Sequence, residues 1–277
     1  MVITSSDRPT PTLDTAASPA TSAMPARAVA APASATSDAA PGRAASSGGI
    51  GAGAAPWLPG TDFIHVQPAD IEATSMAMIE AELPHSINPV LAPIIKRVIH
   101  TTADFEYVDA LTFSPDAVAS AHQALRAGAT IVTDTSMAEA GVNKSALTAL
   151  HGVTRCFMPD PETAERAKAD GTTRATASMD RAASLAGPLI VAIGNAPTAL
   201  IRLHELITAG AIRPALVIAV PVGFVNVIPA KELIMTAGVP FIVARGRKGG
   251  SNVAAAIINA LMYQLTRPET STGLYPR

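Results

Sequence analysis

The chain has 277 residues, of which 48% are hydrophobic and 15% are charged, and its formal net charge is −2. This apolar fraction is too high for a wholly disordered chain, and the near-neutral charge provides no general basic field for binding nucleic acid. The single cysteine, Cys156, excludes an intramolecular disulfide framework, so a reducing cytoplasm is the expected location. No apolar run reaches about 18 residues, and the sequence therefore predicts no membrane span.

Residues 1–56 differ in composition from the rest of the chain. Ala, Pro, Ser, Thr and Gly make up 43 of these 56 residues, and none is aromatic. Such a segment cannot bury enough apolar surface to offset its ordering entropy, so we predict a disordered and dispensable extension. An organelle transit peptide is the minor alternative, because the segment carries Arg27 and Arg43 among Ala and Ser. Residues 57–277 are enough for a single domain.

The first part of this domain is predicted to be mainly helical. A helix over about 68–83 begins with proline and carries acidic residues in its first turn, and a second helix over about 89–99 repeats apolar residues at helical spacing. A third helix begins at Ser114, an N-capping residue, and stops at Gly128. An apolar strand over 129–133 follows it.

Helices and strands alternate more regularly in the second half of the chain. We predict helices over about 160–171, 173–186, 197–210 and 229–238 and from residue 251, and strands over 189–194, 215–220 and 240–244. Continuous apolar strands separated by helices indicate a parallel sheet that is covered on both faces. The sequence therefore predicts a single α/β domain, a three-layer αβα sandwich around a mostly parallel sheet.

Ligands of such sheets bind at the carboxyl ends of the strands. The loop RGRKGGSN, residues 245–252, places three cations and three glycines before a helix, which suits an anion, although a basic turn is the plainer interpretation. The segments 194–196 and 221–223 either present free N–H groups or are ordinary turns. P-loop and dinucleotide fingerprints are absent. Together the three strand ends predict a ligand with several carboxylates, with candidate contacts from Asn195, Gly223, Arg245, Gly249 and Ser251.

One of the six histidines stands out by its position. His100 ends an apolar helical run, one turn after Arg97. A helix C-terminus raises the pKa of an imidazole and a nearby guanidinium lowers it, so the sequence leaves its charge open. Taken alone, the position favours a surface or capping histidine. No nucleophile motif or catalytic Ser/His/Asp spacing is present, which leaves acid–base chemistry by one histidine as the simplest reaction.

Six sequence blocks follow one another through the domain: IIKRVIHTTADFEY (94–107), FSPDAV (113–118), AGATIVTDTSMAEAGVNK (127–144), IGNAPTAL (193–200), PVGFVNV (221–227) and GVPFIVARGRKGGSNVAAAIINAL (238–261). Read together, they resemble the precorrin-8X methylmutase family, which includes the cobalt-precorrin-8 methylmutases of cobalamin biosynthesis. The similarity runs from about residue 63 to residue 265 and leaves the segment before Trp57 outside it.

The resemblance implies an isomerase that moves a methyl group from ring carbon eleven to ring carbon twelve of precorrin-8X or cobalt-precorrin-8, giving hydrogenobyrinate or cobyrinate. It implies no dissociable cofactor, no metal site, and a homodimer with active sites near the subunit interface. The family's catalytic histidine, a proton donor and acceptor, falls on His100. Substrate-contacting positions fall on Ser75, Arg97 and Arg174, and also on Asn143, where some relatives have threonine.

Two other classes of function stay open at this point. A corrinoid-binding carrier could use the same pocket to capture the product and pass it to the next enzyme without chemistry. Replacing His100 by Ala distinguishes the two, since only an enzyme has turnover to lose. A nucleotide-dependent α/β enzyme is disfavoured because the glycine fingerprints are absent.

Overall fold

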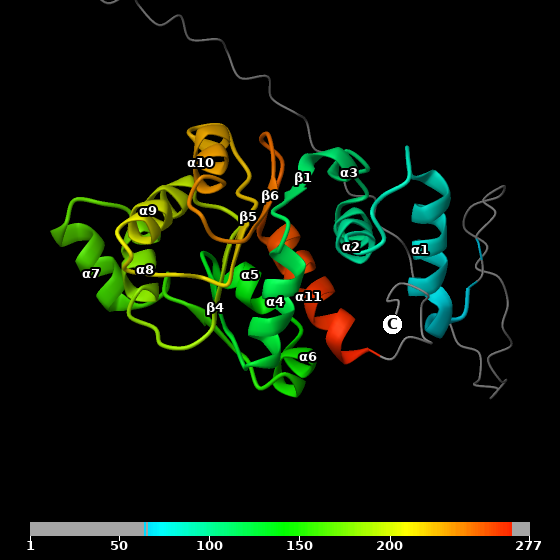
Figure 1. The fold of residues 1–277 in the computed structure, drawn as a ribbon, viewed down its shortest axis with the longest axis horizontal. Coiled ribbons are helices and arrows are strands. Elements are labelled where there is room, and N and C mark those ends of the chain that lie inside the picture. Colours follow the sequence, from blue (N-terminus) through cyan, green and yellow to red (C-terminus); the bar gives the residue numbers. More distant parts are fainter. Residues whose placement is uncertain (1–63, 65, 268–277) are drawn as a thin grey trace, which may run out of the picture. The chain divides into compact units, whose positions relative to one another are not determined.

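The computed structural model describes residue 64 and residues 66–267 (Figure 1). The predicted disordered extension, residues 1–56, lies outside this range. None of the helices in the part of the chain that the structure describes has the length and apolar character needed to cross a membrane.

A six-stranded sheet forms the centre of the domain, with the strand order β1-β6-β5-β4-β2-β3. Only β1 runs antiparallel to its neighbour, and the other pairs are parallel. The strands are β1 (Leu111–Phe113), β2 (Thr130–Thr133), β3 (Val153–Cys156), β4 (Leu189–Ile193), β5 (Leu216–Ala219) and β6 (Phe241–Ala244). The prediction of a mostly parallel sheet is therefore confirmed.

Helices cover both faces of the sheet, which confirms the predicted sandwich (Figure 1). Alternate residues of β4 enter two separate hydrophobic clusters: Ile190 and Ala192 face one side, and Val191 and Ile193 face the other. The first side carries α4 (Ala117–Arg126), α5 (Ser136–Gly141), α6 (Lys144–Ala149) and α11 (Ser251–Thr266). The second side carries α8 (Arg174–Ala182), α9 (Pro197–Thr208) and α10 (Val227–Ile234), and α7 (Pro161–Ala169) packs on α8.

The N-terminal helices of the described region add to the first side. α2 (Ala92–Thr102) packs along α11, and α1 (Ile71–Glu82), which follows the 3₁₀ turn Pro68–Asp70, packs on α2. The short helix α3 (Tyr107–Ala110) connects α2 to β1. Almost all of α11 is buried, because it lies between the sheet and α2. The helix that carries His100 is therefore held by packing on α11 rather than on the sheet.

Several elements differ from the predicted ones. The predictions missed β1, β3 and the short helices α3, α5 and α6, because none of them has an apolar run long enough to show a period. The second predicted helix, 89–99, is displaced to Ala92–Thr102, so that His100 lies within its last turn. α10 begins at Val227, two residues before the predicted start at Pro229, since a proline in the first turn removes no helical hydrogen bond.

Glycine allows the closest approach between loops at the carboxyl ends of β5 and β6. Gly249 has a φ of +156°, and a Cβ built on it would lie 2.0 Å from the carbonyl oxygen of Val220. The next amide, that of Gly250, donates to the same oxygen at 2.9 Å. No other residue can bring the backbone this close to β5.

Gly249→Ala is expected to lower the free energy of unfolding by about 3 kcal/mol or more, because the added methyl group meets backbone that cannot move aside. Gly210→Ala is the matched control: its φ is +71° but open space surrounds the new Cβ, so only the left-handed conformation costs energy, about 1 kcal/mol. Denaturant unfolding measures both, and an equal loss in the two variants would contradict the close approach.

Candidate active site

His100 lies on the exposed side of the last turn of α2. The helix ends at Ala103, whose left-handed backbone lets its N–H donate to the carbonyl of Ile99 at 2.7 Å. Partial burial lowers the pKa of His100, the charge of Arg97 lowers it further, and the charge of Glu72 opposes both. The resulting pKa lies below the ordinary histidine value, so the neutral imidazole is the main form at neutral pH.

A carboxylate and two guanidinium groups lie next to this turn. Glu72, in the first turn of α1, accepts hydrogen bonds from Arg97 and, at 2.8 Å, from Arg267. Burial opposes the ionisation of Glu72, but the two arginines outweigh it, and its pKa is lowered. The guanidinium carbons of Arg267 and Arg97 lie 3.6 and 5.3 Å from the ring centroid of Tyr263, on α11. This Glu72 cluster joins α1, α2 and α11.

Asn143 adjoins the Glu72 cluster, as a cap rather than as a free polar group. Its side-chain oxygen accepts from the amide of Ala146 at 2.9 Å and so begins α6, while its side-chain nitrogen donates to the hydroxyl of Tyr263 at 3.0 Å. Ser75, one turn after Glu72 on α1, is half-buried and donates to the carbonyl of Ile71 at 2.9 Å. Tyr263 thus links Arg97 and Asn143, while His100 comes one turn after Arg97 on α2 and Ser75 one turn after Glu72 on α1.

Three members of this arrangement were not among the predicted site residues. Glu72 was read only as a first-turn acid, and Tyr263 and Arg267 carry no local sequence signal. Glu72 lies 25 residues from Arg97 and 195 from Arg267 along the chain. No periodic pattern links residues at these separations, so sequence reasoning could not have found the cluster.

The loop after β4 contains a correction to the sequence analysis. The three amides of Gly194, Asn195 and Ala196 are not free, because all three donate to the carboxylate of Asp134 at 2.7–2.8 Å. Asp134 is fully buried; burial raises its pKa, and the three amide donors oppose that rise. Asp134 therefore occupies the position that the sequence analysis reserved for a carboxylate of the ligand, and Asn195 is left to contribute its exposed side chain.

The basic loop also differs from its prediction, because protein carboxylates already pair with two of its three cations. Arg245 makes two hydrogen bonds of 2.9 Å to Glu232 on α10, and Lys248 pairs with Asp104 at 2.6 Å and Glu106 at 2.8 Å. Arg247 is exposed, and its guanidinium lies 5.6 Å from the ring centroid of Phe224. Among the described residues, no carboxylate pairs with Arg247.

Lys248 also connects the two parts of the site. Asp104 comes one turn after His100, so its ion pair ties the end of α2 to the loop after β6. The segment after β6 also contacts the segments after β2 and β4: the hydroxyl of Ser251 lies 2.7 Å from that of Thr135, which follows β2, and a Cβ on Gly194, which follows β4, would lie 2.8 Å from the Cα of Ser251. Gly223 joins them through its amide, which donates to the carbonyl of Arg247 at 3.2 Å.

Arg174 stands at the first residue of α8, farther along the same edge of the sheet. Thr173, which caps this helix, lies 3.1 Å from the hydroxyl of Thr198 at the start of α9. The side chain of Arg174 is exposed and forms no ion pair with a described residue. The contacts in the structure do not join it to the Glu72 cluster.

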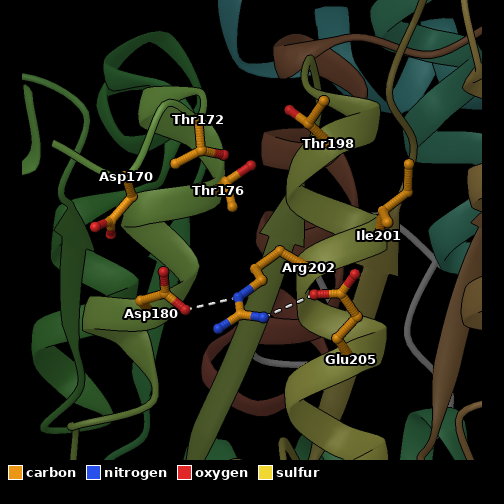
Figure 2. A pocket seen from close by; sticks show the side chains of 8 residues that line it. All are labelled: Asp170, Thr172, Thr176, Asp180, Thr198, Ile201, Arg202 and Glu205. Carbon is orange, nitrogen blue, oxygen red and sulfur yellow. Dashed lines mark hydrogen bonds and ion pairs between the residues drawn. The ribbon is translucent and has the colours of Figure 1, made fainter. Parts of the chain in front are cut away.

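A groove of about 390 Å³ between α8 and α9 lies on the other side of the sheet (Figure 2). Its one cation, Arg202, pairs with Asp180 and Glu205, both at 2.7 Å, and its third carboxylate, Asp170, pairs with Arg166. The lining residues therefore offer no unpaired cation to a ligand with several carboxylates. None of the predicted site residues lines it, and we exclude it from the site.

Comparison with known proteins gives consistent results. A model of the precorrin-8X methylmutase family matches residues 70–264. The cobalt-precorrin-8 methylmutase of Priestia megaterium is 44% identical over 204 residues, which cover 73% of this chain and 91% of that protein. The enzyme of the same name from Salmonella typhimurium is 44% identical over 208 residues, covering 72% and 96%. A solved structure of a precorrin-8X methyl mutase from Thermus thermophilus has a TM-score of 0.65 at 41% identity, covering 70% of this chain and 96% of that one.

Replacing Glu72 by Gln removes the negative charge that partly opposes the lowering of the pKa of His100. We expect the pKa of His100 to fall still further below the ordinary value in E72Q, as followed by NMR titration of its imidazole protons. Glu82→Gln is the matched control, because Glu82 is exposed on the same helix and has no ion pair with a described residue. An unchanged His100 pKa in E72Q would contradict the proximity of these groups.

Proposed function

The chain belongs to the precorrin-8X methylmutase family, and we propose that it is an isomerase of cobalamin biosynthesis that acts on precorrin-8X or cobalt-precorrin-8. In the proposed reaction a methyl group leaves ring carbon eleven and bonds to the adjacent carbon twelve, which gives hydrogenobyrinate or cobyrinate. The observation that carries the proposal is the match of the family over nearly the whole described region. A dissociable cofactor is not part of the proposal.

The proposed proton carrier is His100. Its neutral imidazole can accept a proton from the substrate, and the imidazolium that forms is a stronger acid than an ordinary one because its pKa is lowered. The proton can thus return to a conjugated nitrogen or carbon of the macrocycle, where it polarises the π-system during methyl migration. The substrate gives one proton to His100 and receives one back, so substrate and product have the same mass.

The substrate's acetate and propionate groups need cations and amide donors. Arg174 and Arg247 are exposed guanidinium groups at this edge of the sheet, and neither pairs with a carboxylate among the described residues. We propose these two as the main charge partners, with Ser75, Asn195 and Ser251 as polar contacts. Arg97 and Arg245 act with their carboxylate partners, Arg97 beside His100 and Arg245 at the start of the basic loop. Gly223 and Gly249 allow the backbone to approach the ligand.

We propose that the chain acts as a homodimer in the cytoplasm, with its active sites near the subunit interface. The proposal rests on the resemblance to the family, and product hand-off to the next enzyme of the pathway is compatible with it. Size-exclusion chromatography with light scattering at micromolar protein is expected to give the mass of two chains. A monomer at that concentration would contradict the dimer.

Turnover tests the proposed reaction directly. Anaerobic incubation with precorrin-8X, and separately with its cobalt form, is expected to shift the ultraviolet and visible spectrum to that of the corrin at unchanged mass, with the position of the methyl group confirmed by NMR. The faster of the two substrates identifies the natural one. Bound ligand without rearrangement would instead support a non-catalytic carrier.

His100→Ala is expected to lower kcat by about 100-fold or more with little change in binding, because general acid–base groups contribute about 10²–10⁴. His204→Ala is the matched control, since His204 lies on α9, across the sheet from α2, and is half-buried. Equal turnover by H100A and the wild type would remove His100 from the chemistry.

A further inference from the structure

Lys231 is a fully buried lysine that the proposed reaction has not used. Its side chain, on α10, is 0% exposed, and no carboxylate lies within ion-pair distance among the described residues. Its ammonium donates to the carbonyl oxygens of Gly246 at 3.0 Å and Lys248 at 2.8 Å. Burial lowers the pKa of Lys231 to about 8. A buried charge without a counter-ion costs free energy, so packing alone does not account for a lysine here.

The carbonyl between these two is held as well. The oxygen of Arg247 accepts from the amide of Gly223 at 3.2 Å, so three successive carbonyls bond to the segment from Gly223 to Lys231. Successive peptide units in an extended chain point in alternate directions. Consistent with this alternation, the carbonyls of Gly246 and Lys248, two residues apart, both point toward the ammonium of Lys231.

The orientation of these carbonyls fixes the orientation of the amides. In a planar trans peptide the N–H points opposite to the C=O, so the N–H groups of Arg247 and Gly249 are turned away from Lys231, and that of Lys248 is turned away from Gly223. None of the three amides donates to another described residue. Two unpaired N–H groups that face the same way, those of Arg247 and Gly249, can together bind an anion.

Side-chain bonds hold the same loop from outside. Arg245 is fixed by Glu232, the residue after Lys231, and Lys248 is fixed by Asp104 and Glu106. The two paired cations therefore serve to anchor the loop, and the groups left for recognition are the amides of Arg247 and Gly249 and the guanidinium of Arg247. A carboxylate, with two acceptor oxygens and a negative charge, matches this set.

We propose that Lys231 is a positioning residue, whose ammonium holds the loop 246–249 so that its amides bind one carboxylate of the substrate. The inference rests on the proposed function, because it assigns that carboxylate to the tetrapyrrole. Lys231 does not touch the substrate and acts only through the loop.

The experiment compares Lys231→Met with the wild type and with Ile234→Ala. Methionine fills similar space without a donor, and Ile234 lies one turn later on α10, fully buried on the same face of the sheet, so I234A supplies a destabilised helix with the ammonium intact. The K231M variant is expected to raise KM for the tetrapyrrole substrate by about tenfold or more while kcat changes by less than about threefold. I234A is expected to leave KM unchanged.

A direct measurement of the loop accompanies the kinetics. Hydrogen–deuterium exchange of the peptides that cover residues 245–250 is expected to be faster in K231M than in I234A, since only the first releases the carbonyls. If K231M does not fold, Lys231→Gln, whose side chain is one atom shorter, is judged by the same two measurements.

Each outcome has a separate meaning. An unchanged KM in K231M, an equal rise in I234A, or a loss confined to kcat would overturn the positioning role. Wild-type protein that binds precorrin-8X and its cobalt form without converting either would overturn the proposed reaction instead, and the titration of hydrogenobyrinate against wild type and K231M would still decide the role of Lys231.

Discussion

Two buried ionisable side chains, each bound by backbone groups and by no counter-ion among the described residues, hold the loops at the carboxyl edge of this sheet. Asp134 accepts hydrogen bonds from the amides of the loop after β4, and Lys231 donates hydrogen bonds to the carbonyls of the loop after β6. A buried ion without such partners would be strongly destabilising, so each loop is confined to the conformation that satisfies it. The rest of the candidate site depends on this constraint, because the loop after β4 and the loop after β6 meet where Gly194 contacts Ser251.

The two side chains leave different groups for a ligand. Asp134 accepts from three amides, which are then not available to an anion, whereas Lys231 donates to carbonyls, and the amides of Arg247 and Gly249 on the other side of the loop have no partner among the described residues. In the proposed site, the donors for a polycarboxylate therefore lie mainly in the loop after β6 rather than equally at three strand ends. The exposed guanidinium of Arg247 adds the only loop cation without a carboxylate partner among the described residues.

A different set of contacts, helix packing and the Glu72 carboxylate, supports His100. α2 packs on α11 and α1 packs on α2, and the Glu72 carboxylate bridges the arginines of α2 and of the segment after α11. The neutral imidazole depends on the balance between burial, the Arg97 charge and the Glu72 charge. The ion pair between Lys248 and Asp104 joins this helix end to the loop after β6, so the proposed proton carrier and the proposed carboxylate-binding loop are held by one set of contacts.

The sequence by itself determined the strands with long apolar runs, β2, β4, β5 and β6, and hence the αβα sandwich; from these strands it also predicts the edge of the sheet at which a ligand would bind. It also placed His100 near a helix end, and its six blocks resemble one enzyme family. These properties depend on neighbours within a few residues, or on matching such short stretches in order. The edge strands β1 and β3 were not predicted, because three or four residues with partly or fully exposed positions are too few to show a hydrophobic period.

Only the tertiary structure decided which charges are paired. Asp134 lies 60 residues from Gly194, Lys231 lies 15 from Gly246, and Glu72 lies 195 from Arg267. Whether an amide or a guanidinium is free for a ligand depends on which distant group packing brings to it. Local propensity carries no information about that pairing, so the sequence named the loops of the site but could not tell which of their donors were already in use.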